Sequence, residues 1–314
     1  MAEISGQNAK MNEVFRKVAL SVQNRFKGFD SAIDRMDEEV VDNHFKPVFI
    51  VGPPRSGTTL LFQLLLSQYK LSYISNVMAA FPKYMVTLCG LSPHIASNYT
   101  GGVKKSYYGY ISGLLSPNEA GRIVDEWFGV GGVEIDSRSV RRTIASISSL
   151  TQSPMLIKSL FLSMKINKIN EVLPSARFIY LKRDPVFTAQ SILLAREKIE
   201  GSASRWWSVK PPGYESILDK DPCYQVAWQV ATIERSIYEK LSMLDEGRQM
   251  HITYEDLCNG HDAVLKEVEA RFSLRFCDSC QKQSRDILLG DRKRLDDVRW
   301  AKIKDALDEV TDGH

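Results

Sequence analysis

Residues 48–59 constrain the fold of this chain most, because there an apolar run leads directly into a loop that contains glycine and proline. Their sequence is VFIVGPPRSGTT, and apolar residues resume at once from Leu60 to Leu66. This order predicts a buried strand, a tight turn and the start of a helix. A helix N-terminus after such a turn presents backbone N–H groups and a positive dipole end to an anion. The sequence therefore predicts an anion-binding loop.

The pattern around this loop predicts a single α/β domain. Apolar segments that favour strands alternate along the chain with segments that favour helices. Such alternation is typical of a mainly parallel central sheet flanked by helices, with right-handed crossovers. The predicted strands span 48–51, 71–75, 155–158, 177–181 and 250–254. The predicted helices span 57–69, 137–150, 163–173, 224–245 and 262–272, with others beginning near Pro117 and Pro185.

The sequence divides into three regions. Residues 1–45 favour a helical lead-in, 46–280 form the predicted domain, and 281–314 favour a charged helical tail packed on it. Two segments within the domain, 89–116 and 201–222, have weak periodicity, and we expect loops and short helices over a binding cleft. Asp184 and Pro185 fit the N-cap and first position of a helix.

Composition excludes several classes of protein. The formal net charge of the 314 residues is only +3, from 41 basic and 38 acidic side chains, which does not indicate a nucleic-acid binder. The five scattered cysteines do not form a disulfide framework, and Cys277-x-x-Cys280 is an isolated pair. The sequence contains neither a signal peptide nor the run of about 20 apolar residues that crosses a bilayer. We expect a cytoplasmic protein without a transmembrane segment.

The residues within the loop narrow the choice of anion. Gly52 and Gly57 have the spacing of a nucleotide-triphosphate loop, but Thr58 stands where that motif requires lysine. The predicted downstream strands supply no aspartate suited to hold a metal. The cation of the loop is instead Arg55, and Lys158 and Arg183 fall at the carboxyl ends of other strands, where ligands bind in such sheets. This pattern favours a ligand without a triphosphate, and we expect no metal.

Three segments in order resemble the sulfotransferases, enzymes that use 3′-phosphoadenosine 5′-phosphosulfate as donor. Residues 54–59 are similar to the 5′-phosphosulfate loop of that family. Residues 176–185, with Ser191, resemble its 3′-phosphate-binding strand and helix, and residues 252–257 resemble a third segment. The similarity spans about 48–274 but leaves 75–152 without a recognised motif. It implies the P-loop-NTPase-like sulfotransferase fold, sulfuryl transfer to an acceptor hydroxyl and release of adenosine 3′,5′-bisphosphate.

The resemblance also implies roles for individual residues. Arg55 would neutralise charge on the bridging oxygen of the donor, Lys158 would lie near the transferred group, and Arg183 with Ser191 would bind the 3′-phosphate. The 5′-phosphate would be held by the loop, that is by Pro54, Arg55, Ser56, Gly57, Thr58 and Thr59. No metal takes part. The family form of the loop favours a carbohydrate or glycoconjugate acceptor, while aryl, steroid and peptidyl-tyrosine acceptors stay open.

A general base for the acceptor hydroxyl is not marked by any motif. Glu119 is the first choice, and the competing interpretation is an acidic residue in the first turn of a helix. The other candidates are Glu126, His94, Asp125 and Glu134.

Two other functions are also consistent with this loop. A P-loop kinase with a degenerate ATP loop and a non-catalytic nucleotide-binding protein would both keep this loop.

Six aromatic residues in the irregular segments are either stacking platforms at the cleft or anchors for loops. They are Tyr107, Tyr108, Tyr110, Trp206, Trp207 and Tyr214.

Overall fold

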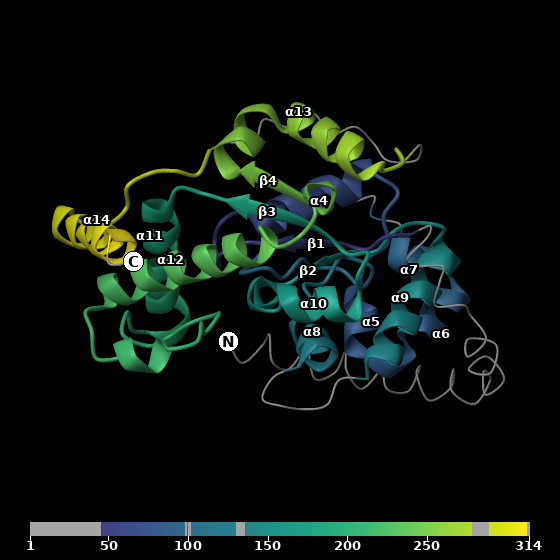
Figure 1. Cartoon of the computed structure of the whole chain (residues 1–314), viewed down its shortest axis with the longest axis horizontal. Coiled ribbons are helices and arrows are strands. Elements are labelled where there is room, and N and C mark those ends of the chain that lie inside the picture. The colour runs from purple at the N-terminus through teal and green to yellow at the C-terminus, as the bar shows by residue number, and fades with distance from the viewer. Residues whose placement is uncertain (1–44, 98, 100–101, 130–135, 278–288, 313–314) are drawn as a thin grey trace.

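The computed structural model describes residues 45–97, 99, 102–129, 136–277 and 289–312 (Figure 1). The predicted lead-in before residue 45, Glu134 and Cys280 lie outside these ranges, and the predicted region boundaries stay predictions. Within the described residues, four strands form one parallel sheet in the order β2-β1-β3-β4. They are β1 (Val48–Val51), β2 (Leu156–Lys158), β3 (Arg177–Lys182) and β4 (Gln249–Thr253). The predicted α/β domain with a mainly parallel sheet is confirmed.

Strand β1 lies in the interior of the sheet between β2 and β3. Phe49 is opposite Ile157 on one side and Phe178 on the other. All four residues of β1 are buried, since helices cover both faces of the sheet. A strand buried on both faces needs no alternation of polar and apolar residues, which explains the continuous apolar run at 48–51.

Each face of the sheet carries its own layer of helices (Figure 1). One layer contains α4 (Thr58–Gln68) and α13 (Tyr254–Phe272). The other contains α8 (Gly121–Phe128), α9 (Ser137–Thr151), α10 (Ile166–Val172) and α12 (Pro222–Leu241). Because successive side chains of a strand point to opposite faces, Ile50 packs in the first layer and Phe49 in the second. The ring of Phe49 stacks on that of Phe178, with centroids 5.7 Å apart.

A further cluster joins α11 (Pro185–Glu200), α12 and α14 (Asp297–Asp312). Ile303 and Leu307 of α14 are buried in it, so the charged C-terminal segment contributes an amphipathic helix that packs on the domain. Asp184 caps α11, accepting hydrogen bonds from the backbone N–H groups of Val186 and Phe187, and Pro185 is its first residue, as predicted.

Several predicted elements differ from the observed ones. Residues 71–75 form two isolated bridges, of Ser72 with Met155 and of Ser75 with Pro117, and no strand. The helix predicted at 163–173 is divided into η2 (Leu160–Met164) and α10, and α13 begins before residue 262 with a kink at Gly260. Segment 76–97 contains α5 (Asn76–Ala80), η1 (Pro82–Tyr84), α6 (Met85–Leu91) and α7 (His94–Ser97). Short turns η3 (Tyr214–Ile217) and η4 (Glu246–Arg248) complete the described elements.

The structure also describes the cysteines and the apolar helices. Cys277 is disulfide-bonded, whereas Cys89, Cys223 and Cys258 are free and buried. Within the described ranges, no helix is both long and apolar enough to cross a membrane.

Candidate active site

The loop between β1 and α4 has the geometry of an anion cradle. Gly57 has a φ of 100° and precedes α4 without a side-chain cap. In the described part of the chain, the backbone N–H groups of Gly57, Thr58 and Thr59 meet no acceptor. These donors are the ones that a helix leaves free at its first turn. A Cβ on Gly57 would lie 2.5 Å from the ring of Tyr254, so only glycine fits here.

Other contacts fix the shape of this loop. The backbone N–H of Gly52 donates to Oγ of Ser163 at 3.0 Å. The hydroxyl of Ser56, which is fully buried, donates to the carbonyl of Pro53 at 2.9 Å. Ser56 therefore shapes the loop through its side chain and leaves the anion to other groups. Arg55 has a φ of 71°, a left-handed conformation that side-chain-bearing residues rarely adopt outside constrained sites.

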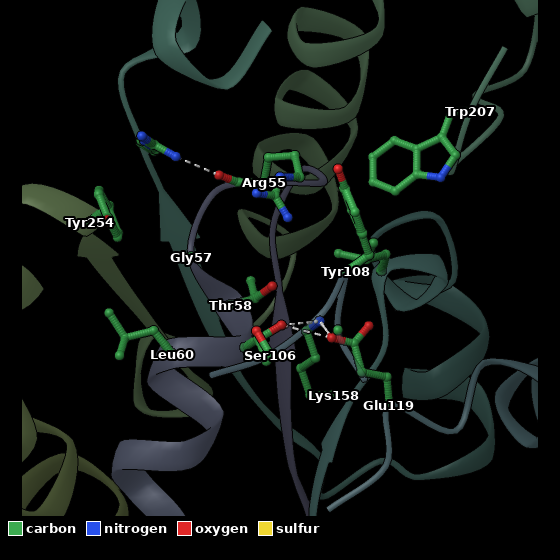
Figure 2. A pocket seen from close by; sticks show the side chains of 14 residues that line it. Arg55, Gly57, Thr58, Leu60, Ser106, Tyr108, Glu119, Lys158, Trp207 and Tyr254 are labelled. Atoms are coloured by element: carbon green, nitrogen blue, oxygen red, sulfur yellow. Dashed lines mark hydrogen bonds and ion pairs between the residues drawn. The ribbon is translucent and has the colours of Figure 1, made fainter. Parts of the chain in front are cut away.

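A buried lysine stands beside the loop at the end of β2. Lys158 pairs in register with Ile50 of β1, and only 2% of its side chain is exposed. Its ammonium group donates to Oγ1 of Thr59 at 3.1 Å and forms an ion pair with Glu119 (Figure 2). Burial lowers the pKa of Lys158, and the neighbouring Glu119 carboxylate opposes that shift. A buried ammonium group needs such partners, because an unpaired charge away from water is costly.

Glu119 reaches this position from a turn that precedes α8. The backbone N–H of Ala120 donates to Oδ1 of Asn118, and Ala120 has a φ of 53°. Helix α8 begins only at Gly121, so the interpretation of Glu119 as an acidic residue in a first helical turn is wrong. Its carboxylate also accepts a hydrogen bond from Oγ1 of Thr59 at 2.7 Å. One carboxylate, one ammonium group and one hydroxyl thus form a compact triad.

A second cation lies on the opposite side of the loop, at the end of β3. The guanidinium group of Arg183 donates through Nη1 to the carbonyl of Arg55 at 2.8 Å and through Nε to Asp291 at 2.8 Å. It also lies over the ring of Tyr254, 4.5 Å from the centroid. Arg183 and Asp291 are both nearly buried, with 8% and 7% of their side chains exposed. Burial raises the pKa of Tyr254 to about 12, so its ring stays neutral near pH 7.

Arg55 connects the two sides of the site. Its Nε donates to Oγ of Ser191 on α11 at 3.0 Å, and its guanidinium lies over the ring of Tyr108 at 5.2 Å from the centroid. Tyr108 contacts Trp207 in an edge-to-face arrangement with centroids 5.7 Å apart. Figure 2 shows Arg55 between the loop and these two rings. One pocket is lined by the charged and hydroxyl side chains described above, namely Arg55, Thr58, Thr59, Glu119, Lys158 and Arg183.

The structure separates the remaining candidates for a general base. Among the described candidates only Glu119 lines the pocket. Glu126 is 60% exposed and pairs with Arg122 on the surface of α8, and His94 is exposed at the start of α7. Asp125 is a half-buried residue of α8 and does not line the pocket.

Some aromatic residues of the irregular segments line the pocket, as stacking platforms would, and others anchor loops. Tyr108 and Trp207 line the pocket. Trp206 instead anchors its loop, donating from Nε1 to the carbonyl of Val209 at 3.0 Å and packing against Tyr214.

Sequence reasoning missed Asp291 and Ser106, and it gave Tyr254, at the end of a predicted strand, no catalytic role. Asp291 lies in the segment that it assigned to a charged tail. Ser106 also lines the pocket. No spacing in the sequence marks Asp291 as a partner of Arg183, because 108 residues separate them. Groups of three or more His, Cys, Asp or Glu side chains suited to a metal ion do not occur among the described residues.

Comparisons with known proteins agree on one family. A family model described as "Sulfotransferase family" matches residues 47–278. Omega-hydroxy-beta-dihydromenaquinone-9 sulfotransferase Stf3, from Mycobacterium bovis and from Mycobacterium tuberculosis, is 21% identical over 252 residues, or 73% of this chain. The chain covers 63% of the length of these relatives. Among solved structures, sulfotransferase STF9 from Mycobacterium avium matches 92% of this chain and 74% of its own, with a TM-score of 0.51 and 14% identity. That likeness shows a shared fold.

Proposed function

Because the chain belongs to the sulfotransferase family, we propose that it transfers a sulfuryl group from 3′-phosphoadenosine 5′-phosphosulfate to an acceptor hydroxyl. The observation that carries this proposal is the convergence of Arg55, Lys158 and Arg183 on one helix N-terminus with free N–H groups. Sulfuryl transfer, like phosphoryl transfer, moves a highly charged group between two oxygens, and positioning with electrostatic stabilisation supplies most of the catalysis. A cytoplasmic location is part of the proposal.

The loop suits the 5′ end of the donor. The backbone N–H groups of residues 57–59 and the hydroxyls of Thr58 and Thr59 would hold the 5′-phosphosulfate. Pro54 and Ser56 would contribute through the shape of the loop, since the Ser56 hydroxyl is bonded to Pro53. Hydrogen bonds from backbone N–H groups to an anion are stronger than bonds between neutral groups.

Arg183 and Ser191 are the proposed ligands of the 3′-phosphate. Both lie next to Arg55, so one donor molecule that spans the loop would place its second phosphate between them. Arg183 is paired with Asp291, and a phosphate would have to share or replace that carboxylate. The 3′-phosphate would therefore exchange one buried ion pair for another, which lowers its net contribution to affinity.

The triad at Lys158 suits the chemical step. The bond from sulfur to the bridging oxygen of the donor breaks while a bond from the acceptor oxygen to sulfur forms. The acceptor proton passes to the carboxylate of Glu119, and Arg55 and Lys158 stabilise the negative charge that builds on the leaving 5′-phosphate. Adenosine 3′,5′-bisphosphate and a sulfate ester are the products.

The acceptor is a hydroxyl-bearing molecule of a class that the family does not fix. The form of the loop favours a carbohydrate or glycoconjugate. The mycobacterial relatives carry the name of a sulfotransferase of an omega-hydroxylated dihydromenaquinone, so their acceptor is not a carbohydrate.

Calorimetry with adenosine 3′,5′-bisphosphate, 5′-AMP and ATP, each with and without EDTA, tests the donor. We expect adenosine 3′,5′-bisphosphate to bind at least about tenfold more tightly than 5′-AMP, since a charge-assisted contact contributes about 1.5–3 kcal/mol, and EDTA to change nothing. Magnesium-dependent binding of ATP would instead favour the P-loop kinase. Equal affinities for the bisphosphate and 5′-AMP would contradict the proposed donor.

Transfer itself separates an enzyme from a non-catalytic nucleotide-binding protein. With donor and a mixture of alcohols, the wild-type chain should form a sulfate ester, and the Arg55→Ala variant should lose most of this activity. A chain that binds the bisphosphate but forms no ester with any alcohol would be a binding protein.

A further inference from the structure

A second cavity of about 560 Å³ borders the candidate active site on the side of Glu119. Its walls come from α5, from the start of α8 and from the loop at 110–120. Asn118 and Ala120 line this groove, and the residue between them, Glu119, lines the active-site pocket. The groove therefore lies beside the turn that carries Glu119, the residue that we propose as the base.

A tight hairpin forms the boundary between the pocket and the groove. Tyr107 and Tyr110 exchange backbone hydrogen bonds of 2.9 and 3.0 Å around Tyr108 and Gly109, both of which have positive φ. Tyr108 lines the pocket, and Tyr110 lines the groove. A Cβ on Gly109 would collide with the carboxylate of Glu119, so the bare glycine backbone lets the hairpin lie against that group.

The surface of the groove and its rim is mainly apolar. Tyr110 and Leu114 line the groove and are 56% and 47% exposed. Tyr107 and Leu115, from the same loop, are 65% and 42% exposed. Phe161, 39% exposed, lies within ordinary contact distance of a Cβ built on Gly121. Large exposed apolar side chains gathered beside a pocket mark a binding surface.

The amide side chains of the groove form hydrogen bonds with each other and with the backbone of the adjoining loop. Asn76 donates through Nδ2 to the carbonyls of Ile111 and Gly113, at 2.8 and 2.7 Å. Asn118 donates to Oδ1 of Asn76 at 2.7 Å and accepts from the N–H of Ala120. Among the described lining residues the only charged side chain is Arg122, which is 68% exposed and faces Glu126. A site for a sugar needs free donors and acceptors to match its hydroxyls, and this groove offers few.

From these observations we infer that the acceptor carries its reactive hydroxyl on an apolar, lipid-like body that lies in the groove between α5 and the 110–120 loop. This inference rests on the proposed sulfuryl transfer and departs from the carbohydrate acceptor that the sequence favours. The apolar body supplies affinity by leaving water, while the hydroxyl is oriented by Glu119 and Lys158.

A series of straight-chain primary alcohols tests the inference. With saturating donor, kcat/KM should rise about fourfold per added methylene from ethanol to decanol, because each buried methylene contributes about 0.8 kcal/mol. Methyl glucoside, a hydroxyl-rich acceptor, should react more slowly than decanol. The Leu114→Ser variant should lower kcat/KM for decanol about fivefold, and this loss should shrink as the alcohol shortens toward ethanol. Leu218→Ser, which changes a leucine of similar exposure (44%) outside the groove, is the matched control.

The outcomes distinguish this inference from the proposed function. Sulfation that does not depend on chain length, or that is faster with methyl glucoside, overturns the apolar acceptor and leaves sulfuryl transfer intact. A change of oligomeric state in Leu114→Ser by light scattering, with the chain-length dependence unaltered, would show that the patch serves self-association instead. Failure to bind adenosine 3′,5′-bisphosphate and to sulfate any alcohol would overturn the proposed function itself. Calorimetric binding of decanol, weakened by Leu114→Ser and not by Leu218→Ser, supports the groove independently of turnover.

Discussion

The two sides of the candidate active site are built differently. On the proposed donor side, Arg55 and Arg183 follow β1 and β3, and Lys158 is the last residue of β2. The parallel sheet brings these ends together, so their proximity follows from topology. On the proposed acceptor side, Tyr108, Glu119 and Leu114 come from a hairpin, a turn and a loop, held by side chains such as Asn76 and Asn118. The fold itself fixes one side of the site, and individual loop contacts fix the other.

This difference determines what the sequence could predict. Strands β1–β4, the cap at Asp184 and the cations of the donor side are all marked by local patterns, and all lie where those patterns indicate. The segment from 75 to 152 carries no recognised motif, and the helix predicted at 137–150, observed as α9, lies outside the site. Its hairpin depends on the positive φ of Tyr108 and Gly109, and Glu119 depends on a turn closed by Asn118. Such contacts between loops leave no periodic trace in a sequence.

The strongest test of the acceptor side is Glu119→Gln. Loss of a general base lowers turnover by about 10² to 10⁴-fold, while affinity for adenosine 3′,5′-bisphosphate should stay within about threefold of wild type. Steady-state kinetics and calorimetry measure the two quantities. Glu126→Gln, which alters an exposed glutamate of α8, is the control and should leave both unchanged. Equal loss of binding and turnover in Glu119→Gln would mean that this carboxylate supports the structure of the site and not proton transfer.

Lys158→Met removes the ammonium group that pairs with Glu119. We expect kcat to fall by about 10² to 10³-fold, as for loss of a preorganised electrostatic contact, and donor binding to weaken far less. Lys168→Met, at a lysine on the surface of α10, is the matched control. Similar activity of the two variants would place Lys158 outside the chemistry.

The pH dependence of kcat gives a second test of Lys158. Since burial lowers the pKa of Lys158 below its ordinary value of 10.5, its charge is lost as pH rises through that lowered pKa. Activity should therefore decline on the alkaline side earlier than an ordinary lysine would cause. Lys158→Arg keeps its charge over this range, so any residual activity of that variant should lack the decline. If Lys158→Arg retains the alkaline decline in kcat, that decline belongs to another group.

Arg183→Ala tests the donor side alone. The variant should lose about 10- to 100-fold in affinity for adenosine 3′,5′-bisphosphate and almost none for 5′-AMP, since only the former carries the phosphate that Arg183 would bind. Arg205→Ala, at an exposed arginine of the 201–222 segment, is the control. An equal loss for both nucleotides would show that Arg183 acts through the carbonyl of Arg55, and so through the shape of the loop.

The smallest effect is expected from Asp291→Asn. Without its carboxylate, Arg183 is free to bind the 3′-phosphate, and affinity for adenosine 3′,5′-bisphosphate should rise by about two- to tenfold. Affinity for 5′-AMP, measured by the same calorimetry, should not change. A fall in affinity for the bisphosphate would instead identify Asp291 as a residue that positions Arg183.

Mass spectrometry of a single reaction mixture tests the central claim, which is sulfuryl transfer at the β1–α4 loop. The purified chain is incubated with 3′-phosphoadenosine 5′-phosphosulfate, decanol and methyl glucoside in EDTA, and both products are quantified over time. We predict adenosine 3′,5′-bisphosphate and sulfate ester in equal amounts, with both formed about 10² to 10³-fold more slowly by Lys158→Met and at an unchanged rate by Lys168→Met. Release of the nucleotide without any ester, or equal product formation by Lys158→Met and the wild type, would contradict it.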